Sequence, residues 1–287
     1  MKIQWYPGHM TKAKRMMIED IKLIDLVIEL VDARIPMSSR NPDIDALAKG
    51  KSRVILLNKA DLADEKVNDR WVQYFSNKGF HVIKADSRNR GGLKNIKTVI
   101  DNACKEKKER DRRKGIINRP VRAMVAGIPN VGKSTFINSF AGRACAKTGN
   151  KPGVTKGKQW IRLGKDVELL DTPGILWPKF DDEKVGTDLA FIGSVNDQVI
   201  NLTELAAELI AFLKENYKGR LNERYGADEG TDDNEIMKSI ALSRGCLKKG
   251  GEIDYDKAVA LLLDDFRSGK LGRISVEVPE DYRYDQR

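Results

Sequence analysis

The stretch GIPNVGKS at residues 127–134 decides the fold of this chain, because it matches the pattern G-x-x-x-x-G-K-[ST] in the required setting. The apolar run VRAMVA (121–126) precedes it and predicts a buried strand, and TFINSFAG (135–142) follows with helical character. Glycines in such a loop let main-chain N–H groups curl around phosphates at a helix N-terminus. The stretch therefore predicts a phosphate-binding loop between a strand and a helix of an α/β domain.

The side chains of this loop have separate expected tasks. Lys133 would reach the β- and γ-phosphates of a nucleotide, and Ser134 would hold Mg²⁺. The remaining nucleotide contacts of the loop are assigned to Asn130, Val131, Gly132 and Thr135.

Six short apolar runs alternate with stretches that are mostly long enough for a crossover helix, which is typical of a largely parallel α/β sheet. The runs are LVIELVD (26–32), RVILLN (53–58), HVIKA (81–85), VRAMVAG (121–127), QWIRL (159–163) and DVELLD (166–171). Only Gly164 and Lys165 separate the last two runs, so these predict an antiparallel hairpin.

After about residue 180 the apolar residues follow helical spacing instead. The helical segments are LTELAAELIAFLKENY (202–217), NEIMKSIALSRG (234–245) and DYDKAVALLLDDFRSGKLG (254–272). Asp254 is the expected N-cap of the last segment, and Gly272 is its expected stop signal. We therefore expect a nucleotide-binding domain over 1–180, a linker at 181–195 and a small all-helical domain over 196–287.

The net charge of +10 is unevenly distributed along the chain. Residues 1–180 hold 37 Lys and Arg against 19 Asp and Glu, whereas residues 181–287 hold 15 against 23. Such an excess of one sign favours a polyanionic partner, and nucleic acid is a better explanation than solubility alone. The charged run KEKKERDRRKGIINR (105–119) is interpreted as a solvated helix end and linker, with phosphate contacts as the alternative.

The cellular location of the protein is predicted from three features: its N-terminal residues, its most apolar segment and its cysteines. The N-terminal residues include no apolar stretch followed by a cleavage site, so they do not resemble a signal peptide. The most apolar run, at 23–32, contains Asp25 and Glu29 and is not expected to span a membrane. Three cysteines lie far apart, at Cys104, Cys145 and Cys246, which argues against disulfides and zinc. We expect a cytoplasmic protein.

Two motifs that follow the phosphate loop in the sequence are expected to contact Mg²⁺ and the γ-phosphate. DTPG at 171–174 ends a predicted strand, where Asp171 would hold Mg²⁺ through water and the Gly174 N–H would sense the γ-phosphate. DTPG alone is also a common turn, but its position after a phosphate loop and a hairpin favours the functional role. Thr155 in KPGVTKG (151–157) is the candidate for the threonine that completes the Mg²⁺ shell.

NKAD within LLNKADL (56–62) identifies the base. Asp61 can accept two hydrogen bonds from the ring N–H and the exocyclic amine of guanine, a pair that adenine lacks. Asn58 would brace the neighbouring loops, and the stem of Lys59 would cover the base. The motif predicts binding of GTP and GDP rather than ATP.

The order of these motifs is unusual, because the base motif precedes the phosphate loop. The order is NKAD (58–61), KADS (84–87), GIPNVGKS (127–134), PGVT (152–155) and DTPG (171–174). It resembles the order in circularly permuted GTPases. Three further segments resemble the YlqF group of these proteins, namely WYPGHM (5–10), DARIPMSSRNP (32–42) and GILWPKF (174–180).

The resemblance covers nearly the whole chain and implies a function. It implies a GTP-hydrolysing assembly factor that binds the precursor of the large ribosomal subunit, both rRNA and ribosomal proteins, and acts in its late maturation. Membrane and DNA partners are not expected, and the protein is expected to be a monomer. The alternative is a GTP-gated binding switch that acts on a protein or membrane partner, with incidental hydrolysis.

The resemblance also implies that Ala85, Asp86 and Ser87 form the loop that contacts one side of the guanine base. The family usually has a Ser-Ala-type tripeptide at this place, so the chain departs from the pattern here. Because that contact is largely made by the main chain, we expect nucleotide binding to persist.

The residue after DTPG is Ile175, where many GTPases place a glutamine that orients the attacking water. Two groups could compensate, and both remain open. His9 could orient or polarise the water, and the resemblance favours a catalytic role for it over an RNA contact. Asn130 could bind K⁺, which would add positive charge near the β–γ bridge. Lys133, Thr155 and Gly174 complete the expected catalytic set.

Overall fold

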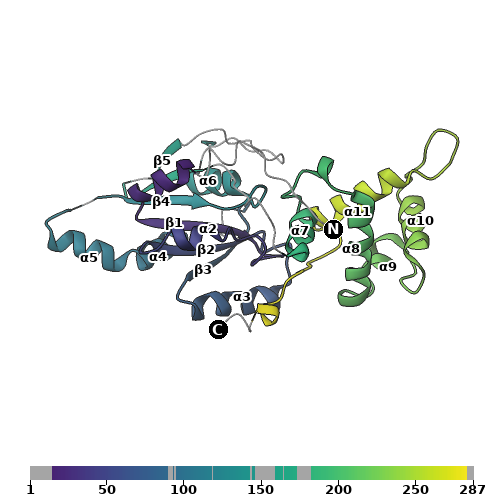
Figure 1. Cartoon of the computed structure of the whole chain (residues 1–287), viewed down its shortest axis with the longest axis horizontal. Helices are drawn as coiled ribbons and strands as arrows, with labels where there is room; N and C mark the ends of the chain where they lie inside the picture. Colours follow the sequence, from purple (N-terminus) through teal and green to yellow (C-terminus); the bar gives the residue numbers. More distant parts are fainter. Residues whose placement is uncertain are drawn as a thin grey trace. The chain divides into compact units, whose positions relative to one another are not determined.

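The computed structural model describes residues 15–89, 93, 95–117, 119–142, 144–145, 159–163, 165–172 and 182–282. The chain forms two compact units (Figure 1). The sheet unit comprises Gln4–Phe180 and Ser275–Arg287, and the helical unit comprises Asp181–Ile274.

The sheet unit is built on a six-stranded sheet in the order β3-β2-β1-β4-β6-β5 (Figure 1). The strands are β1 (Leu26–Asp32), β2 (Ser52–Asn58), β3 (His81–Ala85), β4 (Val121–Ala126), β5 (Gln159–Leu163) and β6 (Val167–Asp171). All neighbouring strands pair in parallel except β5, which pairs antiparallel with β6. The mostly parallel sheet and the hairpin predicted from the sequence are therefore confirmed, with strand ends within one residue of the prediction.

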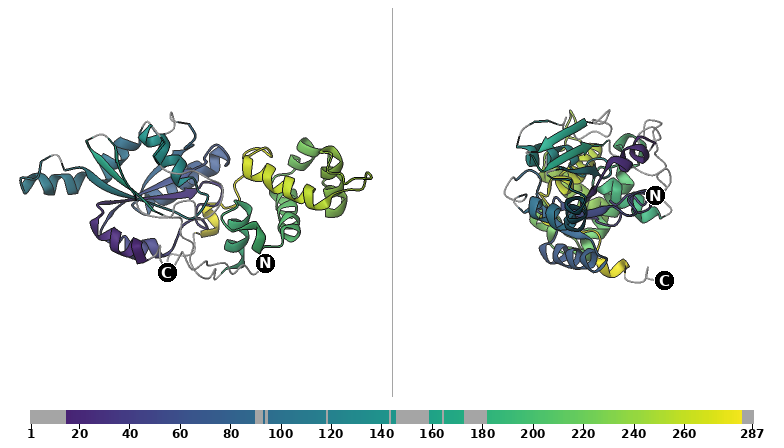
Figure 2. Two further views of the ribbon diagram at one scale, coloured as in Figure 1. Left: turned by 90° about the horizontal axis from the view of Figure 1, so that it is seen from above. Right: turned by 90° about the vertical axis from the view of Figure 1, so that its left-hand side faces the viewer.

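Helices cover both faces of this sheet (Figure 2). The helical segments of the sheet unit are residues 15–20, η1 (Ile21–Leu23), α2 (Asp43–Leu47), α3 (Glu65–Asn77), α4 (Ile96–Ala103), α5 (Lys105–Arg113), α6 (Lys133–Ala141) and η4 (Pro279–Tyr282). Helix α3 packs on the face that presents Ile55 and Leu57, whereas α4 and α6 contact strands from the opposite face. All seven residues of β1 are buried, because a central parallel strand is covered on both sides.

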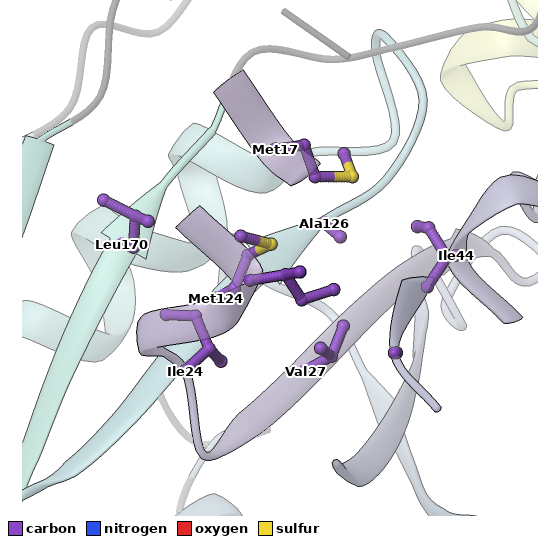
Figure 3. Packing of buried hydrophobic residues seen from close by; sticks show 9 residues of the cluster. Met17, Ile24, Val27, Ile44, Met124, Ala126 and Leu170 are labelled. Carbon is purple, nitrogen blue, oxygen red and sulfur yellow. The ribbon is translucent and has the colours of Figure 1, made fainter. Parts of the chain in front are cut away.

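One core cluster lies beneath residues 15–24 (Figure 3). Met17, Ile21 and Ile24 pack there against Val27 of β1 and against strands β4 and β6. These side chains alternate with buried residues that face the other side, as the period of a strand requires. The cluster fixes the sheet on which the phosphate loop is mounted.

The helical unit consists of helices that, except for α9, begin at an Asp or Asn N-cap. They are α7 (Glu183–Phe191), η3 (Asp197–Val199), α8 (Leu202–Asn216), α9 (Arg220–Tyr225), α10 (Asp233–Ser243) and α11 (Tyr255–Ser268). The Asp254 carboxylate accepts a hydrogen bond from the Lys257 N–H at 3.1 Å, which confirms the predicted cap of α11. The predicted stop at Gly272 is wrong, because α11 ends at Ser268 with Gly269 in the left-handed conformation at φ 79°.

The unit boundaries differ from the expected domain boundaries in two places. The segment 181–195, expected to be a linker, contains α7, whose Leu189, Ala190 and Phe191 are buried. Asp182 caps this helix by accepting a hydrogen bond from the Lys184 N–H at 2.8 Å. The last residues, expected to be part of the helical domain, belong to the sheet unit from Ser275 onward.

A buried carboxylate holds this C-terminal segment on the sheet unit. Glu277 is fully buried and accepts hydrogen bonds from the main-chain N–H groups of Met37 and Ser38, at 2.7 and 2.9 Å. The Tyr282 hydroxyl donates a third bond to the same carboxylate at 2.8 Å. Burial raises the pKa of Glu277, although these donors oppose the shift. The segment therefore anchors to the loop after β1, at a position remote in sequence.

None of the helices in the described part of the chain combines the length and the hydrophobicity needed to cross a lipid bilayer.

Candidate nucleotide-binding site

The phosphate loop lies between the end of β4 and the start of α6, as the sequence predicted. Gly132 precedes the helix in the left-handed conformation at φ 94°, and a Cβ there would collide with the side-chain amide of Asn58. A Cβ on Gly127 would lie 2.6 Å from the carbonyl oxygen of Leu30. Both glycines are thus required by the close approach of the loop to neighbouring strands.

Lys133, the first residue of α6, is held inside this loop. Its Nζ donates a hydrogen bond to the Ile128 carbonyl oxygen at 2.6 Å, and the residue is only 8% exposed. Burial lowers the pKa of Lys133 to about 8, although the nearby Asp171 carboxylate opposes the shift. An ammonium group that has lost so much hydration is stabilised strongly by an anion, and a phosphate group fits this requirement.

Asp171 ends β6 and is buried. Burial raises the pKa of Asp171 to about 6, against the opposing effects of Lys133 and the Thr172 N–H. Its Oδ1 atom is buried and has no hydrogen-bond partner among the described residues. A buried carboxylate oxygen without a partner is costly, and a Mg²⁺ ion or its bound water would satisfy it. Ser134, at the start of α6, supplies the hydroxyl that such a site requires.

Asn58, the last residue of β2, ties three loops together. Its Nδ2 donates a hydrogen bond to the Val131 carbonyl oxygen at 2.6 Å. Its Oδ1 accepts hydrogen bonds from the N–H and the hydroxyl of Ser87, at 3.1 and 2.7 Å. The predicted brace between neighbouring loops is therefore present in the structure.

Asp61 carries a second unsatisfied carboxylate oxygen. Its Oδ2 accepts a hydrogen bond from the Arg88 guanidinium, but its Oδ1 is buried and has no partner among the described residues. Asp86 also contacts Arg88, with its Oδ1 3.3 Å from the Arg88 Nε. Ala85 is buried at the end of β3, and its carbonyl accepts a hydrogen bond from the Ala60 N–H at 3.1 Å. The guanine-reading motif and the tripeptide assigned to the base therefore lie together.

Asp32, for which the sequence motifs predict no role, anchors Lys59. Lys59 has a left-handed main chain at φ 57°, and its Nζ lies 2.9 Å from the Asp32 Oδ2. Arg34 donates two further hydrogen bonds to the same carboxylate, at 2.9 and 2.8 Å. Burial alone would raise the pKa of Asp32, but the charges of Arg34 and Lys59 outweigh it and lower the pKa. The parallel pairing of β1 with β2 places Asp32 opposite Asn58, a relationship that the two strand ends could have signalled.

Several predicted site residues lie outside the described part of the chain. They are His9, Thr155 and Gly174, together with Ile175 after the DTPG motif. Their assigned roles stay predictions. The described residues bring together both ends of a nucleotide site, with Lys133 and Asp171 on the phosphate side and Asp61 on the base side.

Comparison with known proteins agrees with this geometry. Residues 122–229 match the family described as 50S ribosome-binding GTPase. Ribosome biogenesis GTPase A of Bacillus cereus is 49% identical over 283 residues, which covers 98% of this chain and 96% of that protein. The chain belongs to the ribosome biogenesis GTPase A (YlqF) family. The corresponding protein of Thermotoga maritima is 34% identical over 97% of this chain and 95% of its own length.

A solved structure gives the same result. GNP-bound YlqF from T. maritima is 30% identical, covers 94% of this chain and 99% of its own, and superposes with a TM-score of 0.67. The chain is therefore a P-loop GTPase of the circularly permuted YlqF type, and its family acts in ribosome biogenesis. The protein binds GTP and GDP and hydrolyses GTP, and Mg²⁺ is the general cofactor of such domains.

Proposed function

We propose that this GTPase binds the precursor of the large ribosomal subunit in its GTP-bound state, acts in late maturation and leaves after hydrolysis. The observation that supports this most directly is the match of residues 122–229 to a family described as binding the 50S ribosome. The excess of Lys and Arg in residues 1–180 favours an RNA surface as the partner. We further propose that the protein acts as a cytoplasmic monomer.

In this proposal the residues around the phosphate loop each contact a different part of the nucleotide or its Mg²⁺ ion. Lys133 leaves the Ile128 carbonyl and pairs with the β- and γ-phosphates. Ser134, Thr155 and Asp171, the last through water, would hold Mg²⁺, which would supply positive charge near the phosphates. Main-chain groups of Asn130, Val131, Gly132 and Thr135 complete the cradle, and Gly174 senses the γ-phosphate.

Two groups are proposed to take the role of the water-orienting glutamine, since the Ile175 side chain cannot hydrogen-bond with water. His9 orients the attacking water, because an imidazole can accept a proton from it near neutral pH. Asn130, which has a left-handed main chain at φ 62°, takes part in a K⁺ site that adds positive charge near the β–γ bridge. A low intrinsic rate and stimulation by the ribosome follow from the absence of a built-in glutamine.

The nucleotide state is proposed to act on the helical unit through the two segments that connect it to the sheet unit. DTPG is followed within a few residues by Asp181, where the helical unit begins, so ordering of Gly174 by the γ-phosphate would act on that connection. The unit ends at Ile274, and the Ser275 hydroxyl accepts a hydrogen bond from the Asp64 N–H at 3.1 Å, close in sequence to Asp61. We propose that the helical unit contacts rRNA and that nucleotide state governs this contact.

Sedimentation with purified large subunits and with their precursors tests the proposal. The protein is incubated with a non-hydrolysable GTP analogue, with GDP or without nucleotide, and the pelleted fraction is measured. Association with the large-subunit particles is expected with the analogue and should be weak with GDP. Equal association in all three conditions would contradict the nucleotide control, and no association in any condition would contradict the ribosomal partner.

A further inference from the structure

Helix α5 has a composition that packing does not explain. None of its residues from Lys105 to Arg113 has a buried side chain, and all nine of them are charged. A helix that is polar on every side gains little from burial and depends on ion pairs such as that between Lys107 and Asp111, at 3.1 Å. Figures 1 and 2 show α5 extending outward from the body of the sheet unit. Its exposed side chains are therefore free to serve a partner.

The charge on this helix and the following chain is strongly positive. Residues 105–122 hold nine Lys and Arg against three Asp and Glu. Several of these cations are exposed and form no ion pair with any described residue; they are Lys105, Arg110, Arg112, Arg113 and Lys114. A row of unneutralised Arg and Lys side chains is suited to the phosphates of a nucleic acid.

An exposed aromatic side chain lies on the edge strand β5. Trp160 is 40% exposed, and the guanidinium of Arg122 on β4 lies 5.5 Å from the centre of its ring. Arg122 is itself fixed by Glu168, with its Nε 3.2 Å from a carboxylate oxygen. Arg162 pairs with Glu168 in the strand register and is also exposed, so Arg162 and Arg122 flank Glu168 on one face of the sheet. An exposed indole held by an arginine is suited to stacking with an unpaired base.

The carboxylate of Asp25 connects helix α5 with the strand that carries Arg122. Asp25 lies 3.1 Å from the Lys107 Nζ of α5 and 3.5 Å from the Arg119 guanidinium. The same carboxylate accepts a hydrogen bond from the Arg122 N–H at 3.1 Å. We call this the amino-edge surface, defined by α5, Arg119, Arg122, Trp160 and Arg162.

The amino-edge surface is separate from the nucleotide site. Arg122 lies near the start of β4, whereas the phosphate loop follows the end of that strand. Five residue steps along a strand span roughly 17 Å at about 3.3 Å per residue. Substitutions on this surface can therefore be tested without touching the groups that bind GTP.

We infer that the amino-edge surface binds RNA, with α5 along the phosphate backbone and an unpaired base stacked on Trp160. The inference deepens the proposed function and rests on it, since the proposed partner is a ribosomal particle. An anionic membrane is the main rival, because Ile116 and Ile117 are exposed beside the cations. RNA is favoured because Arg122 holds the exposed Trp160 ring on the sheet face, where it can stack with a base, whereas a membrane gives no such role to an aromatic ring paired with arginine on a strand.

Fluorescence anisotropy of the full chain with labelled oligoadenylate tests the inference over a series of salt concentrations. The variant Arg110→Ala/Arg112→Ala/Arg113→Ala should reduce the magnitude of the slope of log affinity against log salt by about 2, because each lost phosphate contact contributes about 0.7 for single strands. Trp160→Ala should weaken binding about 5- to 150-fold with little change of slope, the range expected for one stacked base. Trp160→Phe should restore most of the affinity.

The matched control removes the same charge elsewhere on the sheet unit, in the variant Lys49→Ala/Lys66→Ala/Lys78→Ala, whose positions are all exposed. All variants should retain the parental rate of GTP hydrolysis without ribosomes, which also shows that they are folded. If the α5 variant and the control have the same salt slope, or if Trp160→Ala binds as the parent does, the inference is overturned. It is also overturned if the variants lose binding to phosphatidylglycerol vesicles and keep their affinity for RNA.

The same variants separate this inference from the proposed function. If the parent protein sediments with large-subunit particles and both sets of amino-edge variants do so equally well, the surface is not the RNA contact, and the ribosomal partner stands. If the parent protein itself does not sediment with the particles, the proposed function fails, whatever the oligoadenylate measurements show.

Discussion

The side-chain amide of Asn58 donates a hydrogen bond of 2.6 Å to the main-chain carbonyl of Val131. Asn58 belongs to the base-recognition motif and Val131 to the phosphate loop, so one side chain connects the two ends of the nucleotide site. Permutation changes the order of these segments along the chain, but the parallel sheet still brings their strand ends to one edge. The reversed motif order therefore leaves the nucleotide site intact.

Replacing Asn58 with alanine should weaken GTP and GDP binding equally. The substitution removes the bond to Val131 and both bonds to Ser87, and leaves buried polar groups unpaired at a cost of about 1–3 kcal/mol. Turnover at saturating GTP should change much less, because the side chain is assigned to the loops and not to the reacting atoms. Titration with a fluorescent GDP analogue measures the effect. Asn58→Asp keeps the acceptor for Ser87 but places a buried carboxylate oxygen against the Val131 carbonyl, so it should bind no better than Asn58→Ala. Parental affinity in both variants would contradict the bracing role.

Replacing Asp61 with asparagine should change the base preference from guanine toward xanthine. The Asp61 Oδ1 is buried and has no partner among the described residues, so it is the oxygen available to the base. The amide places a donor at one of the two acceptor positions, and the expected loss of GTP affinity is roughly 2–4 kcal/mol. Competition between GTP and xanthosine triphosphate measures the preference. Arg88→Ala is the control, because it frees the other oxygen and should keep the guanine preference. An unchanged preference in Asp61→Asn would remove the guanine assignment.

The sequence was sufficient for the strands and for the motif loops, because both are local patterns. All six strands begin and end within one residue of the predicted ends, and Asn58 makes the contacts expected of it. Contacts between distant segments were not predictable in this way. Glu277 and Met37 are 240 residues apart, and no local pattern predicts that a glutamate near the C-terminus is buried against the loop after β1. The same limit applies to Asp32 with Lys59 and to Arg88 with Asp61.

Removal of the Lys133 ammonium or the Ser134 hydroxyl should abolish GTP turnover while the fold is kept. Burial lowers the pKa of Lys133 to about 8. The buried ammonium therefore lowers the free energy of unfolding of the nucleotide-free protein near neutral pH. Lys133→Ala should therefore not destabilise the protein, and Lys133→Met, which fills more of the space, should be at least as stable as the parent. Phosphate release and thermal unfolding without nucleotide measure both parts. Parental turnover in Lys133→Ala or in Ser134→Ala would contradict the assignment of the phosphate loop.

Replacing His9 with alanine should lower the ribosome-stimulated rate on the order of a hundredfold, as expected for loss of a water-orienting group. GTP affinity should hardly change, because His9 is assigned to the attacking water and not to the bound nucleotide. Asn130→Ala is the matched comparison, since its defect should appear mainly as lost K⁺ stimulation and should shrink in Na⁺. If His9→Ala instead loses affinity for the ribosome and turns over normally once bound, His9 is an RNA contact.

Replacing Asp32 with asparagine should destabilise the protein by about 3–5 kcal/mol at neutral pH, because the buried Arg34 and the partly buried Lys59 would keep their charges without this carboxylate. The pKa of Asp32 is lower in the folded than in the unfolded protein. The unfolded state therefore binds more protons, and the stability from this group is present above pH of about 4 and declines below it, by about 1.4 kcal/mol per pH unit. Urea unfolding at neutral pH and at about pH 3 measures the change, and the difference between parent and variant should shrink at the lower pH. Asp69→Asn is the control, since Asp69 forms an exposed pair with Lys84 at 2.6 Å and should cost less than about 1 kcal/mol. A difference that is constant with pH, or as small as that of the control, would show that Asp32 does not stabilise the loop that carries Lys59.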